Sequence, residues 1–346
     1  EPGSRDRLEV HASPAGPAGT AGTAAVATGI IRDLGGPAAG SPAGEPAGKS
    51  AEAAAGLSTA ELTPWDFGRQ PAALPGWHGA LASDIPVGAG LSSSAALELA
   101  VAVGWLALAG RRMDPLPLAR LAQRAENEWV GVSTGLLDQL ACAAGVEDHA
   151  LLMDCRAGTV EPVPLPYGVA VVVLDTGTRR QVATSEYARR RAECERAARL
   201  LGVPALRDLH PELPEDAARR LDPVALARAR HVVAENRRVL AVAQALRSGD
   251  AGLAGALLTE GHRSIRDDFE VSGPELDAAV AAATAAPGCF GARMTGAGFA
   301  GCVVALVARS RLAEFRAAVE AGYRERTGRP LTVFECAPAP GASASP

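Results

Sequence analysis

The residues best suited to chemistry form the string Pro86-Val-Gly-Ala-Gly-Leu-Ser-Ser-Ser-Ala-Ala-Leu-Glu98. Glycines let backbone N–H groups come close to an anion, and a helix that follows directs its positive end towards the same place. Three successive serines, Ser92 to Ser94, add hydroxyl groups that can bind phosphate oxygens or a magnesium ion. The string predicts a phosphate-binding loop. A Ser-capped turn before a buried helix is the structural alternative.

Other known glycine patterns do not fit this string. The dinucleotide-binding pattern GxGxxG requires a glycine where Ser93 stands, and the nucleophile-elbow pattern GxSxG requires one where Ser94 stands. The upstream segment Gly44-Glu-Pro-Ala-Gly-Lys-Ser50 nearly matches a P-loop but is one residue short, because Ala43 holds the first glycine position. It follows no predicted strand, so we interpret the near-match as chance.

Two carboxylates lie in segments that we expect to be helical. Asp138 sits in Thr134-Gly-Leu-Leu-Asp-Gln139 among apolar neighbours, and a carboxylate in such a place is costly unless it is paired or functional. The spacing leaves both a structural ion pair and a functional role open. Glu126 lies near the end of a core-directed helix, and taken by itself it is more simply interpreted as an exposed helical glutamate.

A second glycine-rich segment, Met294-Thr-Gly-Ala-Gly-Phe-Ala-Gly301, precedes an apolar strand. It can be a tight hairpin with positive φ at its glycines, or a loop that approaches a phosphate group. Two phosphate-compatible loops and two carboxylates together suggest phosphoryl transfer, which needs an anion cradle, a metal ligand and a base.

Hydrophobic periodicity predicts the elements that position these residues. We expect helices over 95–109, 115–129, 135–143, 185–201, 223–247, 252–266 and 311–327, and one more opened by a capping box at Ser272–Glu275. The first should be buried, since it is apolar on nearly every face, and Ser133 or Thr134 should cap the third. We expect strands over 8–11, 24–32, 81–85, 150–154, 169–175, 302–307 and 331–336. This mixture without strict βαβ repetition predicts the α+β class.

The length of 346 residues, of which 48% are hydrophobic, suggests two lobes with a sizeable core. We place the lobes at 1–166 and 167–346. Residues 12–58 are dominated by Ala, Gly, Pro, Ser and Thr, so they bury too little apolar surface to offset their ordering entropy. We expect that segment to be poorly ordered.

Composition also limits partners and location. The net charge of −5 and the lack of a Lys/Arg run argue against nucleic acid. The longest apolar stretch, 95–109, contains Glu98 and is shorter than the roughly 20 residues that a bilayer requires, so we expect no membrane span. No signal peptide is evident. The six cysteines are scattered without a CxxC pair, which predicts reduced, mostly buried thiols in a cytoplasmic protein.

Taken in order, several segments resemble the galactokinase pattern, and the resemblance covers the chain from Trp77 to near Pro338. The serine-rich loop alone would indicate only the GHMP kinase superfamily. Besides Pro86–Glu98, the matching segments are Ala125-Glu-Asn-Glu-Trp-Val130, Gly135-Leu-Leu-Asp-Gln139, His149-Ala-Leu-Leu-Met-Asp-Cys155, Thr184-Ser-Glu-Tyr187, His262-Arg-Ser-Ile-Arg-Asp-Asp268 and Arg293-Met-Thr-Gly-Ala-Gly-Phe-Ala-Gly-Cys302.

The resemblance implies a two-lobed GHMP kinase fold with a ferredoxin-like C-terminal lobe, and phosphorylation of galactose by ATP to galactose 1-phosphate with Mg²⁺ as cofactor. Asp138 would be the catalytic carboxylate near the anomeric hydroxyl, as base or electrostatic organiser. Ser94 and Glu126 would ligate magnesium. The sugar would be contacted by Asp138, Tyr187, Gly296 and Ala297. The ATP phosphates would be held by Gly88, Ala89, Gly90, Leu91, Ser92, Ser93 and Ser94.

The chain departs from the family pattern in two respects. Ala297 and Ala300 stand where the family usually has glycine, so an added methyl could restrict positive φ or crowd the site. The family also opens with an Arg-containing stretch of the form Gly-Arg-Val-Asn-Leu-Ile-Gly-Glu-His-Thr-Asp, and nothing here matches it. Truncation or a degenerate paralogue would explain this, and we expect the chain as given to be a poor galactose kinase. The alternatives are another GHMP small-molecule kinase and a non-catalytic protein that binds sugar and ATP.

Overall fold

The structure is a computed structural model that describes residues 83–132, 134–179, 183–209 and 212–344. Their contacts divide them into two units, one containing Leu97–Leu136 and the other containing Asp84–Ala96 and Leu137–Ala342. The segment 12–58 and the expected strands 8–11 and 24–32 lie outside the described residues. The assignment of two lobes at 1–166 and 167–346 stays a prediction.

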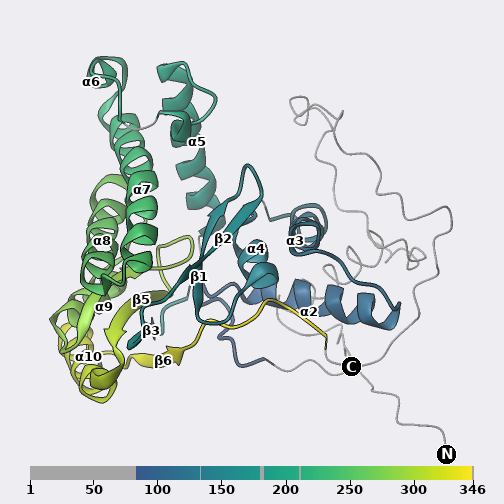
Figure 1. Cartoon of the computed structure of the whole chain (residues 1–346). Helices are drawn as coiled ribbons and strands as arrows, with labels where there is room; N and C mark the ends of the chain where they lie inside the picture. Colours follow the sequence, from purple (N-terminus) through teal and green to yellow (C-terminus); the bar gives the residue numbers. More distant parts are fainter. Residues whose placement is uncertain (1–82, 133, 180–182, 210–211, 345–346) are drawn as a thin grey trace, which may run out of the picture. The chain divides into compact units, whose positions relative to one another are not determined.

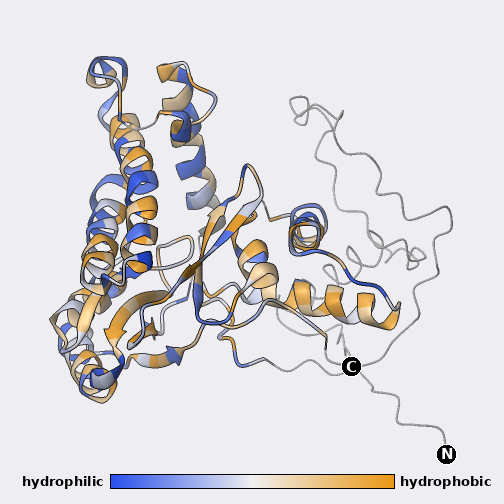
Figure 2. Cartoon of the chain, viewed as in Figure 1, coloured by the Kyte–Doolittle hydropathy of each residue, from blue (hydrophilic) through white to orange (hydrophobic). Residues whose placement is uncertain are grey.

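The first unit is helical. Helix α2 (Ser93–Leu108) enters it from the second unit, and α3 (Pro115–Arg124) continues directly into the π-helical turn η1 (Ala125–Val130). Figure 2 shows α2 as predominantly hydrophobic, and most of its side chains from Ala95 to Leu106 are buried, as predicted. Proline at the start of α3 fits the predicted helix opening, because its missing N–H has no helical partner at that position.

The second unit contains a four-stranded antiparallel sheet in the order β4-β5-β3-β6 (Figure 1). Its strands are β3 (Val169–Asp175), β4 (Cys289–Met294), β5 (Cys302–Ala308) and β6 (Thr332–Cys336). Helices separate β3 from β4 and β5 from β6, so the chain runs β-α-β-β-α-β. This connection and strand order are those of a ferredoxin-like fold, which confirms the predicted fold class.

Helices α9 (Pro274–Ala285) and α10 (Leu312–Thr327) contribute Leu276, Phe315 and Val319 to one hydrophobic core with Val303 and other strand residues. Helix α8 (Ala251–Ser264) lies against β4 at a point where two glycines meet. A Cβ atom on Gly291 would lie 1.8 Å from the carbonyl oxygen of Gly255, so neither position has room for a side chain. These two glycines therefore fix how closely α8 approaches the sheet.

Longer helices extend from this core, as Figure 1 shows for α5, α7 and α8. They are α5 (Ala183–Leu201), the short α6 (Ala217–Arg220), α7 (Pro223–Arg247) and α8, which ends in the π-helical turn η3 (Ile265–Phe269). Single 3-10 turns occur at η2 (Leu206–Asp208) and η4 (Arg309–Arg311). The predicted start of α7 is confirmed, because the Asp222 carboxylate accepts hydrogen bonds from the amides of Val224 and Ala225.

Two further elements complete the second unit. Helix α4 (Leu137–Ala144) precedes an antiparallel hairpin of β1 (His149–Asp154) and β2 (Thr159–Pro164). Neither β2 nor β4 was predicted from the sequence. Strand β2 contains two prolines and exposes most of its residues, whereas β4 is interrupted by Gly291, so neither shows the usual strand pattern.

Three local predictions were wrong. Thr134 does not cap α4, which begins only at Leu137, because its hydroxyl donates to Glu126 and Asn127 instead. The capping box at Ser272–Glu275 is absent, since Gly273 is the N-cap of α9 and the Ser272 hydroxyl donates to Asp277. Of the expected strand 81–85, the described residues 83–85 are not in a strand.

Candidate active site

The first glycine loop has a backbone suited to an anion. Gly88, Gly90 and Ser92 have φ values of +71°, +77° and +57°, while Ala89 and Leu91 between them do not have positive φ. Such alternation turns successive N–H groups towards one concavity, the arrangement that holds phosphates in other proteins. The sequence predicted that the glycines let backbone N–H groups approach an anion, but it gave no sign of the left-handed Ser92, because serine seldom adopts positive φ. Helix α2 starts immediately afterwards at Ser93.

The two glycine loops pack against each other. A Cβ atom on Gly301, whose φ is +106°, would lie 2.4 Å from the carbonyl oxygen of Ala89, which is itself fully buried. Thr176, just after β3, donates from its hydroxyl and its amide to the carbonyl oxygen of Gly301. The close approach therefore requires glycine at position 301 and makes the two loops one structural unit.

The second loop follows β4 and turns through residues of positive φ at Gly296, Gly298, Phe299 and Gly301. The loop also contacts the segment before α9, because the amide of Phe299 donates a hydrogen bond to the carbonyl of Val271 at 2.6 Å. Neither Ala297 nor Ala300 has positive φ, so the expectation that their methyl groups restrict the backbone was wrong. The left-handed non-glycine residue in this loop is Phe299.

An ion pair that the sequence analysis missed borders the first loop. Arg179 donates from two guanidinium nitrogens to the two carboxylate oxygens of Asp175, both at 2.8 Å, and this bonding raises the pKa of Arg179. A Cβ atom on Gly88 would lie 3.6 Å from the Arg179 side chain. The bidentate bond thus holds a partly exposed guanidinium beside the loop. The sequence does contain a signal for this ion pair, because Asp175 ends a buried strand and Arg179 follows it four residues later.

Asp138 does not have the apolar surroundings that the sequence predicted. It is the second residue of α4, and its side chain is exposed, whereas the neighbouring Gln139 and Leu140 are buried. The argument from the cost of a buried carboxylate is therefore wrong. An acidic residue in the first turn is instead favoured by the positive end of the helix. The exposed carboxylate remains available to a ligand.

Glu126 also contradicts the simpler interpretation, since it is buried rather than exposed. It lies in η1 and accepts a 2.7 Å hydrogen bond from the hydroxyl of Thr134. Asn127 accepts hydrogen bonds from the amide and the hydroxyl of Thr134, which ties the segment leading to α4 to η1. Ser94, exposed at the start of α2, belongs to the second unit, so its convergence with Glu126 stays a prediction.

Tyr187 lies near the start of α5, where 39% of it is exposed. One turn after Tyr187, a cluster of charged residues attaches α5 to α7. The buried guanidinium of Arg228 on α7 donates to Glu193 of α5 at 2.8 Å and also to the carboxylate of Glu270. Arg190 of α5 donates to Glu193 and to the carbonyl of Glu270. The cluster Arg190–Glu193–Arg228–Glu270 therefore joins α5 and α7 to the residue next to Val271.

The described residues contain no group of three or more His, Cys, Asp or Glu side chains placed to hold a metal ion. None of the helices in the described ranges is long and apolar enough to cross a membrane. Among the described residues no cysteine is in a disulfide, and Cys302 is buried whereas Cys155 is exposed.

Comparison with known proteins agrees with this architecture. Residues 51–146 match the family "GHMP kinases N terminal domain", and residues 242–325 match "GHMP kinases C terminal". The two glycine loops, at 86–98 and 294–301, lie within the matched ranges, and the chain belongs to the GHMP kinases.

Individual relatives narrow the assignment. The galactokinase of Chloroflexus aggregans is 48% identical over 266 residues, which cover 75% of this chain and 68% of that protein. The galactokinase of Roseiflexus sp. is 48% identical over 261 residues, covering 74% and 67%. The crystal structure of Lactococcus lactis galactokinase complexed with galactose matches with a TM-score of 0.71 and 36% identity, covering 75% and 68%. The chain belongs to the galactokinase family.

Proposed function

We propose that the chain transfers the γ-phosphoryl group of ATP to the anomeric hydroxyl of galactose and forms galactose 1-phosphate. The observation that carries this proposal is the pair of glycine loops, packed together at Gly301 and Ala89 beside the guanidinium of Arg179. Phosphoryl transfer depends mainly on positioning and on stabilising negative charge. A concavity of backbone N–H groups next to a fixed cation supplies both.

In this proposal the residues from Gly88 to Ser94 hold the phosphates of ATP. The loop leads directly into the start of α2, so the helix dipole would add to the hydrogen bonds that the loop N–H groups make with the phosphates. The hydroxyls of Ser92 and Ser93 are partly buried, whereas that of Ser94 is exposed. Ser94 is accordingly the serine best placed to reach a ligand in solution.

The donor set fits Mg²⁺ by its chemistry. This ion prefers hard oxygen ligands and is usually held by one or two carboxylates together with substrate phosphates and water, so a three-residue cluster is not required. The Ser94 hydroxyl and the Glu126 carboxylate would be the protein ligands. Bound there, the ion would neutralise charge on the phosphates, while the Thr134 hydroxyl orients the carboxylate of Glu126.

The sugar would be held by Tyr187 and by the second loop at Gly296 and Ala297, with Asp138 near the reacting hydroxyl. The exposed carboxylate of Asp138 can accept the proton of that hydroxyl or orient it. A cytoplasmic location is supported by the six free thiols.

The test is the replacement Asp138→Asn, which keeps the shape and removes the charge. Because Asp138 is exposed, we expect unchanged thermal unfolding and ATP affinity, while formation of galactose 1-phosphate falls about a hundredfold or more. Product is measured by mass spectrometry, so that slow turnover is detected. Asp148→Asn, at another exposed aspartate of the same unit, is the matched control. Absence of product from the unmodified chain, or normal turnover in Asp138→Asn, would contradict the proposal.

A further inference from the structure

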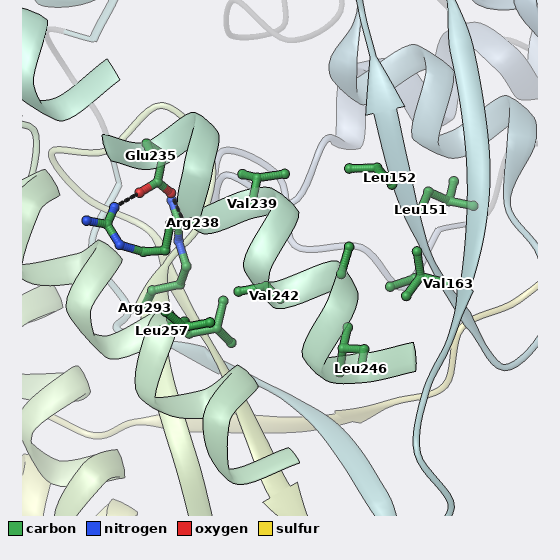
Figure 3. A pocket seen from close by; sticks show the side chains of 13 residues that line it. Leu151, Leu152, Val163, Glu235, Arg238, Val239, Val242, Leu246, Leu257 and Arg293 are labelled. Carbon is green, nitrogen blue, oxygen red and sulfur yellow. Dashed lines mark hydrogen bonds and ion pairs between the residues drawn. The ribbon is translucent and has the colours of Figure 1, made fainter. Parts of the chain in front are cut away.

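A pocket of about 130 Å³ lies outside the candidate active site, between the hairpin β1–β2 and helices α7 and α8 (Figure 3). Leu152 and Val163 line it from the hairpin, Val242 and Leu246 from α7, and Leu257 from α8. None of the residues assigned to ATP, metal or sugar takes part. Its walls are mainly aliphatic, as those of small-molecule sites usually are.

One end of the pocket is charged. Figure 3 shows the Glu235 carboxylate between the guanidinium groups of Arg238 and Arg293, with which it forms two ion pairs. All three residues line the pocket, so its wall carries two positive charges and one negative charge. Glu260 also pairs with Arg238, at 3.1 Å, but it is 60% exposed and does not line the pocket.

Arg293 has donors to spare. A guanidinium carries five N–H donors, and among the described residues Arg293 donates only to Glu235, through one nitrogen. Its side chain is 25% exposed, so the other nitrogens can be reached. Gly261 makes room for the cluster, because a Cβ atom there would lie 3.3 Å from Glu235, Arg238 and Arg293 alike. The charged end of the pocket therefore contains a guanidinium, that of Arg293, with N–H donors that a ligand can use.

We infer that this pocket binds a small amphipathic anion, with its apolar body along Val242, Leu246 and Leu257 and its carboxylate or sulfonate on Arg293. Complementarity selects this class of ligand, since a planar acid group matches the N–H donors that Arg293 does not use in its bond with Glu235. A neutral molecule of the same shape would leave those donors unused.

Binding is tested with the fluorescent probe 1-anilinonaphthalene-8-sulfonate, which has an aromatic body and one sulfonate. We expect saturable binding to the whole chain, and at least about tenfold weaker binding to Val242→Trp, because the indole fills the pocket. The matched control is Leu240→Trp on the same helix, a residue 51% exposed and outside the pocket. Thermal unfolding shows whether each variant is folded, and Leu257→Trp replaces Val242→Trp if the latter is not.

The charge requirement is tested by displacing the probe with octanoate or octan-1-ol, which share an alkyl chain. We expect octanoate to displace the probe at a concentration about ten times lower than octan-1-ol. Equal displacement by the two compounds would overturn the inference, as would unchanged probe affinity in the folded pocket-filling variant or absence of saturable binding to the unmodified chain.

Discussion

His231 on α7 is a buried histidine that the fold keeps uncharged. Its ring stacks on Phe269 at a centroid distance of 4.4 Å, and its Nδ1 lies 3.0 Å from the hydroxyl of Ser264. Burial lowers the pKa of His231 from 6.5 to about 4, helped by nearby Arg293 and Arg238 and opposed by Glu235 and Asp268. Between these pH values the unfolded chain binds a proton that the folded chain does not, so folding becomes less favourable as pH falls.

We therefore expect the free energy of unfolding to lose on the order of 3 kcal/mol through His231 as pH falls from 6.5 to 4. His231→Gln can still bond with Ser264 but does not titrate, so its stability should depend less on pH in this interval. Urea unfolding of both proteins at pH 4.5 and 7.5 measures the difference. Parallel pH profiles for the variant and the unmodified chain would contradict a titrating His231.

At the scale of elements, the cluster Arg190–Glu193–Arg228–Glu270 determines how α5, and with it Tyr187, is attached to α7. We expect Arg228→Met to lower the free energy of unfolding by about 1–3 kcal/mol, because Glu193 loses one of its two buried arginine partners and keeps only Arg190. Urea unfolding checks this. Arg191→Met on α5 is the control, since the Arg191–Glu195 pair is exposed and should contribute less than about 1 kcal/mol.

If Arg228→Met remains folded at low temperature, its KM for galactose should rise more than its KM for ATP, because α5 carries Tyr187 whereas the phosphate loop does not depend on it. Equal effects on both constants would indicate general destabilisation rather than a positioning role for the cluster.

The helices and strands differ in how well the local sequence predicted them. The start of the long helix α7 was predicted to the residue, because Asp222 and Pro223 define it locally. Strand β4 was missed because Gly291 is explained only by its contact with Gly255, which is distant in the sequence. Local patterns therefore predicted most helices and the first loop. The exposure of Asp138, the burial of Glu126 and the Arg179–Asp175 pair depend on tertiary packing, which no local pattern encodes.

At the scale of the whole molecule, the proposed magnesium ligands Ser94 and Glu126 lie far apart in the sequence. One ion bound by both would make the affinity for ATP depend on Mg²⁺ through each residue. Glu126→Gln is nearly isosteric and keeps an acceptor for the Thr134 hydroxyl, so we expect the fold to persist while the Mg²⁺ concentration needed for half-maximal ATP binding rises about tenfold or more.

Calorimetric titration with ATP at several Mg²⁺ concentrations makes this measurement, with Glu128→Gln, an exposed glutamate of the same turn, as the control. Ser94→Ala should have a similar effect. Because both groups would act through one ion, the double variant should lose clearly less than the sum of the two single losses. Additive losses would place Ser94 and Glu126 at independent sites, and an unchanged Mg²⁺ dependence in Glu126→Gln would remove that residue from the metal site.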